Sequence, residues 1–235
     1  MGNLPLEIWH NFDKQREFSW KLQGAALASL KTIIPRPEDL HAIDCENLSE
    51  ANRRLRSLVS PILKGGDPHQ AKALARWIVS EWGGIRRNAE AIPAWVDHMI
   101  PFTSSSVHDF VNKQGFNRIS SWSKILAFAN PDQDAIYDAR TAVALNCGLW
   151  KLGDNRRFHM PKSRNTSVKL AQEKLANKQS KECLGYFEYI EFLKESVNAG
   201  IFPDILSAEM CLFSNAPQIS DIFMDKIKKK SGCKS

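Results

Sequence analysis

The chain has 235 residues, of which 43% are hydrophobic and 25% are charged, and its formal net charge is +6. This composition is typical of a globular protein with enough apolar residues for one large domain or two small lobes. It has no apolar run long enough to span a membrane and no signal-peptide pattern at its start, so we expect neither a membrane span nor secretion.

Almost every segment has the apolar spacing of an amphipathic helix, and no convincing alternating strand stands out. One predicted helix presents a single apolar face made of Leu55, Leu58, Val59 and Ile62. The next begins at Asp67-Pro68, an N-cap followed by proline at the first helical position, and stops at Gly83-Gly84. Another is predicted from about Asn88 to Met99. We therefore predict an all-α protein.

The C-terminal part starts with residues 151–166, which lack helical periodicity and predict a long basic loop. Loops of this length inside compact domains are often functional. Residues 167–227 again predict helices, with Ser180 as the cap of a long one. Two shorter helices are expected around Ile205–Phe213 and Ile222–Ile227. Residues 1–235 are taken as one domain.

Charge is distributed unevenly along this C-terminal part. Residues 151–181 hold nine lysines and arginines against two acids, and residues 182–225 hold eight acids against one lysine. Such blocks suit one basic face for a polyanion and one face turned away from it, although a basic run can also be only a solvated loop. The Lys-rich segment 228–235 predicts a disordered tail.

Residues 120–146 hold the groups of a candidate catalytic site. Lys124 is expected near the start of a short apolar helix that ends at Asn130-Pro131, and Asp138 at the start of the next helix. A helix N-terminus favours a carboxylate over an ammonium, and burial lowers the pKa of a lysine further. A neutral amine beside a carboxylate suits attack on the sugar carbon of a nucleotide. The alternative is that Lys124 is solvated and Asp138 only caps its helix.

The same segment carries a fixed series of residues: Ser123-Lys124, Leu126, Phe128, Pro131-Asp132, Ile136-Tyr137-Asp138, Arg140 and Ala142. This series resembles that of the helix-hairpin-helix DNA glycosylases, and most closely a bacterial group similar to 8-oxoguanine DNA glycosylase. The resemblance implies a two-lobed helical bundle of that type, with the hairpin and active-site segment at about residues 115–147. It also implies that Lys124 attacks the sugar C1′ as the base departs, forming a Schiff base, and that Asp138 supports the positive transition state.

Two features depart from the family pattern. The usual hairpin is Gly-x-Gly, whose bare backbone approaches a DNA phosphate, whereas Ser120-Ser121-Trp122-Ser123 stands here. Trp122 cannot replace a glycine at a tight contact and can pack under the hairpin instead. The connection between lysine and aspartate is also shorter than in better-known members.

Candidate nucleic-acid contacts follow from the resemblance and the basic residues, since phosphates attract arginine and lysine. They are Arg118, Ser120, Ser121 and Ser123 in the hairpin, Arg86 and Arg87 after Gly83-Gly84, and Arg156, Arg157, Lys162 and Arg164 in the basic loop. Arg140 either binds DNA or pairs with Asp138. A base turned out of the stack needs a pocket, for which Trp122, Phe128 and Tyr137 are candidates if they are not core residues.

No metal or cofactor is expected. The aspartates at 132, 134 and 138 lack the glycine and glutamate of a calcium loop, and the histidines have no ligand spacing. The five cysteines are scattered without a CxxC pair, which predicts a reduced, cytoplasmic protein without disulfides or a zinc cluster. A glycosylase of this kind would be associated with the nucleoid.

The sequence therefore predicts a DNA glycosylase, with AP-lyase chemistry through Lys124, that excises a damaged or modified base from duplex DNA. Base excision repair and antiphage defence both fit this activity. One alternative is a helical nucleic-acid-binding protein without catalysis, for example an antiphage defence component. Another is a helical protein-interaction module whose basic patches meet an acidic partner.

Overall fold

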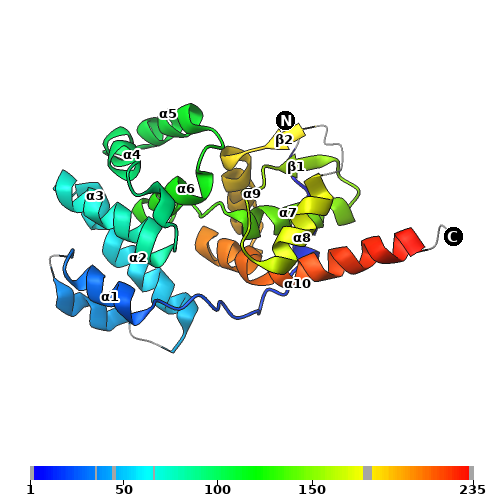
Figure 1. Cartoon of the computed structure of the whole chain (residues 1–235), viewed down its shortest axis with the longest axis horizontal. Helices are drawn as coiled ribbons and strands as arrows, with labels where there is room; N and C mark the ends of the chain where they lie inside the picture. The colour runs from blue at the N-terminus through cyan, green and yellow to red at the C-terminus, as the bar shows by residue number, and fades with distance from the viewer. Residues whose placement is uncertain (1–2, 35, 44–45, 66, 177–181, 233–235) are drawn as a thin grey trace. The chain divides into compact units, whose positions relative to one another are not determined.

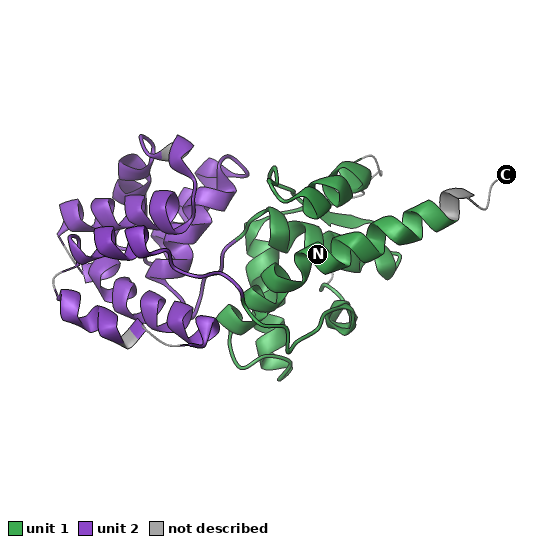
Figure 2. Cartoon of the chain, turned by 60° about the horizontal axis from the view of Figure 1, so that its bottom comes forward, with its two compact units in different colours: residues 1–18, 137–235 green, residues 19–136 purple. Residues whose placement is uncertain are grey.

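The computed structural model describes residues 3–34, 36–43, 46–65, 67–176 and 182–232, and nearly all of their regular structure is helical (Figure 1). The all-α prediction is confirmed for these residues, apart from one pair of three-residue strands. The chain forms two compact units (Figure 2). Unit 1 comprises residues 1–18 and 137–235, and unit 2 comprises residues 19–136.

The described part of unit 2 contains six α-helices and three short 3-10 or π-helical segments. The α-helices are α1 (Gly24–Lys31), α2 (Leu48–Gly65), α3 (Pro68–Trp77), α4 (Ile92–Met99), α5 (Ser104–Gln114) and α6 (Ile119–Ala129). The shorter segments are η2 (Pro37–Ile43), η3 (Ile78–Trp82) and η4 (Arg86–Asn88). The helix α6 packs against α2 and η3, and α3 packs against α4.

Local sequence explains several boundaries in unit 2. As predicted, α3 begins at Pro68 with Asp67 as its N-cap residue. It continues directly into the π-helical segment η3, which ends at Trp82 with Gly83 as its C-cap residue. Gly84 then has φ +66°, a left-handed conformation that glycine adopts without the Cβ penalty. The helix expected from Asn88 starts later, at Ile92.

Unit 1 contains helices and one short strand pair. Its elements are η1 (Leu6–Asn11), α7 (Ala139–Lys151), β1 (Arg156–Phe158), α8 (Thr166–Ala176), β2 (Glu182–Leu184), α9 (Tyr186–Asn198) and α10 (Ile205–Gly232). The helix α10 packs against α7, α8 and α9. Fully buried Trp9 joins η1 to this core, because its ring stacks on Phe192 at 5.2 Å and its Nε1 donates to Ser196 Oγ at 2.6 Å.

Residues 205–232 form one continuous helix, so the prediction of two short helices and a disordered tail is wrong as far as Gly232. The apolar period breaks between the two predicted pieces because polar residues occupy buried positions there. The Asn215 side chain donates to Asp13 O at 2.8 Å, and Ser220 Oγ donates to the helix backbone at Ala216 O. These hydrogen bonds satisfy side chains that a hydrophobic pattern would place on the surface.

The predicted loop 151–166 contains strand β1, which pairs in parallel with β2. The buried side chain of Asn146 on α7 fixes this strand, because it accepts from Phe158 N at 2.8 Å and donates to Phe158 O at 2.9 Å. The loop prediction is therefore wrong for residues 156–158. The predicted cap at Ser180 lies outside the described residues, and the following helix, α9, begins at Tyr186.

Candidate active site

Lys124 is a buried lysine in the second turn of α6. Its residue surface is 6% exposed, and Nζ donates to Ser120 O at 2.7 Å. Because α6 already begins at Ile119, the expected position of Lys124 at the helix start is wrong. Lysine is rarely buried to this degree unless its ammonium is paired, and here Nζ binds the Ser120 carbonyl.

The aliphatic chain of Lys124 lies against Gly83, the C-cap residue of η3. A Cβ added to Gly83 would lie 2.8 Å from Lys124 Cδ and 2.9 Å from Lys124 Cε, closer than real Cβ contacts. The rings of Trp82 and Phe128 meet edge to face at 4.9 Å next to this contact and hold η3 on α6. Gly83 was predicted to stop a helix, and the local sequence gives no signal for this contact.

Asp138 is the N-cap of α7, as predicted, and it forms a capping box with Thr141. Its Oδ1 accepts from Arg140 N at 2.8 Å and from Thr141 N at 3.1 Å, while Thr141 Oγ1 accepts from Asp138 N at 3.0 Å. Its Oδ2 accepts no hydrogen bond from any residue that the structure describes. The carboxylate is thus held in place through one oxygen. Asp138 belongs to unit 1, and Lys124 belongs to unit 2.

The turn between α5 and α6 consists of residues 115–118, not of the serines expected to form the hairpin. Ser121 and Ser123 lie inside α6, where their residues are 1% and 0% exposed. Ser120 is half-buried, and Arg118 is exposed in a left-handed conformation with φ 55°. Of these four candidate contacts, only Arg118 and Ser120 reach the surface.

Trp122 packs under this turn, which was predicted from the sequence as the alternative to a contact with DNA. Its ring meets Phe110 edge to face at 5.9 Å, and its Nε1 donates to Asn117 O at 2.9 Å. Phe128 is also fully buried, with the Arg56 guanidinium 5.3 Å above its ring. Tyr137 is buried in unit 1, where its hydroxyl donates to His159 O at 2.6 Å and burial raises the pKa of that hydroxyl. All three candidates for a base pocket therefore lie in the core.

The remaining basic candidates divide into exposed and internally paired residues. The exposed ones are Arg86, Arg87, Lys162 and Arg164. In contrast, Arg156 Nη2 lies 2.7 Å from Asp154 Oδ2, and hydrogen bonding to Arg156 lowers the pKa of the Asp154 carboxyl. Arg157 is 8% exposed and donates to two backbone carbonyls, and burial lowers the pKa of its guanidinium.

The Arg140 side chain does not pair with Asp138, which was one of its two expected roles. Its guanidinium lies 4.3 Å from the centre of the Phe213 ring, which belongs to α10. Arginine over an aromatic face is a stabilising cation–π contact. The Arg140 backbone N–H, rather than its side chain, binds Asp138.

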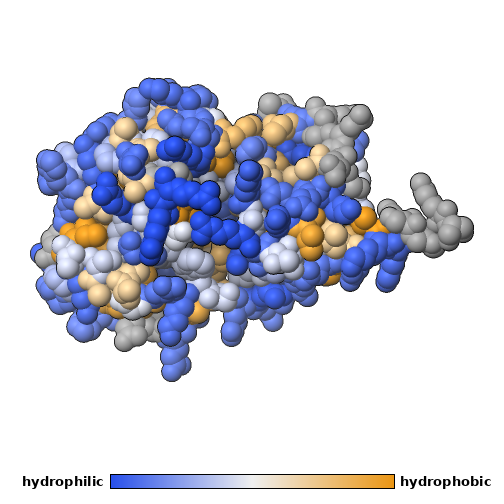
Figure 3. All heavy atoms as spheres, in the orientation of Figure 1, coloured by the Kyte–Doolittle hydropathy of each residue, from blue (hydrophilic) through white to orange (hydrophobic). Residues whose placement is uncertain are grey.

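The face drawn in Figure 3 is mainly hydrophilic, with only scattered apolar side chains. In the part of the chain that the structure describes, no group of three or more histidine, cysteine, aspartate or glutamate residues could hold a metal ion. No described helix has the length and apolar character needed to cross a membrane.

Comparisons with protein-family models, with curated proteins and with solved structures find no significant match for this chain. The arrangement of its own side chains therefore carries the functional argument.

Proposed function

We propose that the chain is a DNA glycosylase with AP-lyase chemistry, in which Lys124 is the nucleophile and Asp138 stabilises the transition state. The single observation that carries this proposal is the 6% exposed lysine whose carbon chain is seated against Gly83. A desolvated lysine can lose its proton near neutral pH, and only the neutral amine can attack.

In the proposed reaction, the bond between the sugar C1′ and the base breaks as the Lys124 amine bonds to C1′. The electron pair of the broken bond leaves with the base, which takes up a proton. The bonded nitrogen then loses a proton, the C1′–O4′ bond breaks as O4′ takes up a proton, and a protonated Schiff base remains between the nitrogen and C1′. Loss of the base builds positive charge on the sugar, and a carboxylate held in a fixed position stabilises such developing charge. Asp138 meets this requirement, because its capping hydrogen bonds engage Oδ1.

For the DNA contacts, the proposal relies on the exposed basic residues. Arg118 stands at the turn before α6, Arg86 and Arg87 follow η3, and Lys162 and Arg164 follow β1. Exposed arginines and lysines bind phosphates irrespective of sequence and make the affinity fall with salt. The buried Ser121 and Ser123 side chains and the core aromatic residues do not enter the proposal.

The test is borohydride trapping on duplexes that carry oxidised, alkylated, deaminated or hypermodified bases. We expect a covalent adduct with at least one of these bases, lost in Lys124→Gln but kept in Lys64→Gln, which removes an exposed lysine from α2 of the same unit. DNA affinity should be similar in both variants. Failure of the whole panel to give an adduct would overturn the lyase chemistry.

A non-catalytic nucleic-acid-binding protein is the second candidate function. The replacement of the Gly-x-Gly hairpin, with two of its serines buried in α6, favours it. If the protein has this function, we expect it to bind lesion-free and lesion-containing duplexes equally strongly, with an affinity that falls with salt, and to excise no base. A preference for one lesion together with release of its base would exclude it.

A further inference from the structure

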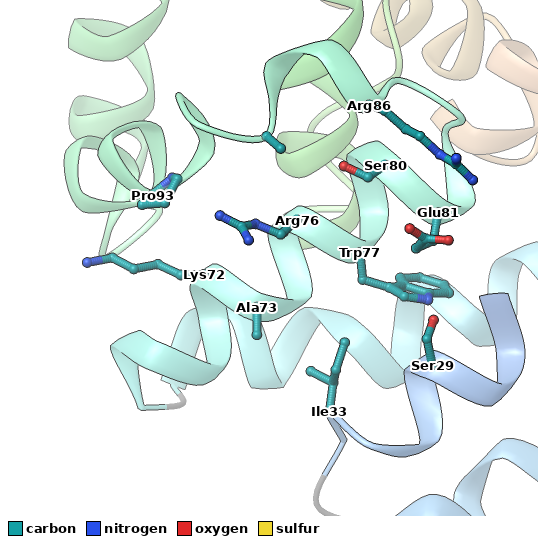
Figure 4. A pocket seen from close by; sticks show the side chains of 11 residues that line it. Ser29, Ile33, Lys72, Ala73, Arg76, Trp77, Ser80, Glu81, Arg86 and Pro93 are labelled. Carbon is teal, nitrogen blue, oxygen red and sulfur yellow. The ribbon is translucent and has the colours of Figure 1, made fainter. Parts of the chain in front are cut away.

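Unit 2 carries an open groove with a volume of about 540 Å³ (Figure 4). Residues from α1, α3, η3, η4 and α4 and from the segments next to them line it. Pockets of this size commonly hold organic ligands, with an apolar lining and a few placed polar groups. Of these residues, only Arg86 was a candidate from the sequence.

The cationic side chains of the groove are Lys72, Arg76 and Arg86. Lys72 Nζ lies 2.6 Å from Asp97 Oδ1, so this charge is already compensated. Arg76 and Arg86 are exposed, and neither has a salt bridge with a described residue. In Figure 4, Arg86 points to the side where Glu81 lies, whereas Arg76 extends toward Pro93. Arg76 is therefore the least compensated cation of the groove.

Ser80 adds a buried polar group to the lining of the groove. Its residue is 9% exposed, and its buried hydroxyl has no hydrogen-bond partner among the described residues. In Figure 4 the hydroxyl points to the side of the groove where the Arg76 side chain lies. A buried hydroxyl without a partner costs free energy, which a ligand that supplies an acceptor recovers.

We propose that this groove binds a phosphate ester of nucleotide size. Arg76 and Ser80 bind the phosphate, because a guanidinium and a hydroxyl are strong donors to phosphate oxygens. Ile33, Ala73 and Pro93 supply an apolar surface for the organic part of the ligand. Phosphate alone would leave most of the groove empty, so the organic part contributes to binding. This inference does not depend on the proposed glycosylase activity.

Titration calorimetry on the full-length chain tests the proposal with three probes: deoxyadenosine 5′-monophosphate, deoxyadenosine and inorganic phosphate. We expect saturable binding of the monophosphate, and binding weaker by about tenfold or more for the other two, because each lacks one half of the ligand. No saturable binding of the monophosphate, or equal binding of the nucleoside, would overturn the proposal.

Variants test the assigned residues. Arg76→Gln should weaken monophosphate binding by about tenfold or more, since it removes charge-assisted hydrogen bonds. Ser80→Ala should weaken binding without lowering the melting temperature, because the deleted hydroxyl has no partner in the free protein. Arg54→Gln is the matched control, an exposed arginine on α2 outside the groove, and it should bind as the wild type does. Wild-type affinity in Arg76→Gln would contradict the assignment.

Two further comparisons separate the sources of the phosphate and the two proposals. A single-stranded oligonucleotide with a 5′-phosphate should displace the monophosphate if the natural ligand is a strand end. If this oligonucleotide competes no better than the same oligonucleotide with a 5′-hydroxyl, the natural ligand is a free nucleotide. Lys124→Gln should retain full monophosphate binding while losing the covalent DNA adduct. The groove and the glycosylase proposal therefore fail or succeed separately.

Discussion

Gly83 and Lys124 are far apart in the sequence but lie in contact. Because Gly83 has no side chain, it leaves room for the carbon chain of Lys124. A Cβ on Gly83 would approach Lys124 Cδ to 2.8 Å and Val79 O to 2.9 Å. Because Lys124 is also fixed through Nζ to the Ser120 carbonyl, its chain is held both along its length and at its end. Gly83 is the C-cap residue of the π-helical segment η3. Such segments often occur at functional sites.

Gly83→Ala should displace Lys124 and slow formation of the covalent DNA adduct by about tenfold or more, because small displacements of a catalytic group are costly. The extra methyl group should also destabilise the fold by about 1–3 kcal/mol. Single-turnover trapping and denaturant unfolding measure the two effects. Gly24→Ala on α1 is the control, since its added Cβ meets nothing within 4 Å. A wild-type trapping rate in Gly83→Ala would show that Lys124 needs no such support.

The variant Asp138→Asn distinguishes the helix-capping role of Asp138 from its proposed catalytic role. Asparagine caps a helix about as well as aspartate, so the free energy of unfolding should change by less than about 0.5 kcal/mol. The charge that stabilises the transition state is lost, and the excision rate should fall about a hundredfold. Asp138→Ala should in addition cost about 1 kcal/mol of stability through loss of the cap. Unchanged excision in Asp138→Asn would leave this residue with a structural role only.

Asn146→Ala should destabilise unit 1 strongly. The Asn146 side chain is fully buried and satisfies both the N–H and the carbonyl of Phe158. Leaving two buried backbone groups without partners should cost at least about 2 kcal/mol in denaturant unfolding. Asn112→Ala, which changes an exposed asparagine of α5, is the matched control and should change stability by less than about 0.5 kcal/mol. A small effect of Asn146→Ala would mean that β1 is not held through this side chain.

The three described cysteines are free and should react with thiol reagents in a fixed order. Burial raises the pKa of Cys147, and it raises the pKa of Cys211 to about 12. A raised pKa keeps a thiol protonated at about pH 8, and only the thiolate reacts. Partial burial also raises the pKa of Cys183, but its exposed thiol is the one that reagents reach in the folded protein. Cys183 should therefore be labelled first, and faster as the pH rises, with the buried pair labelled only after unfolding. Peptide mass spectrometry measures the order, and early labelling of Cys147 would contradict the burial.

Sequence patterns predicted features that depend on neighbouring residues. Asp67-Pro68 and Gly83 mark the two ends of the α3–η3 segment, and Asp138 caps α7, because capping and helix termination are local effects. Lys124 lies about one helical turn further into its helix than predicted. The reason is that α6 begins directly after the left-handed Arg118, earlier than the apolar pattern indicates.

Features that depend on distant residues escaped prediction. The strand β1 is too short to show alternation, and its partner Asn146 lies on another element. The polar residues Asn215 and Ser220 interrupt the apolar period of α10 although they are buried. Likewise, nothing in the local sequence around Lys124 indicates that Gly83 lies against it. Such contacts follow from tertiary packing rather than from local propensity.

The most direct measurement identifies the residue that carries the covalent adduct. After borohydride trapping on a lesion-containing duplex and removal of the DNA, tryptic digestion should give the added mass on a peptide of residues 119–140. Trypsin does not cleave after a modified lysine, and Lys124 is the only lysine in that peptide. We predict the adduct there and nowhere else. An adduct on another lysine, or on the N-terminal amine, would contradict the assignment of Lys124 as the nucleophile.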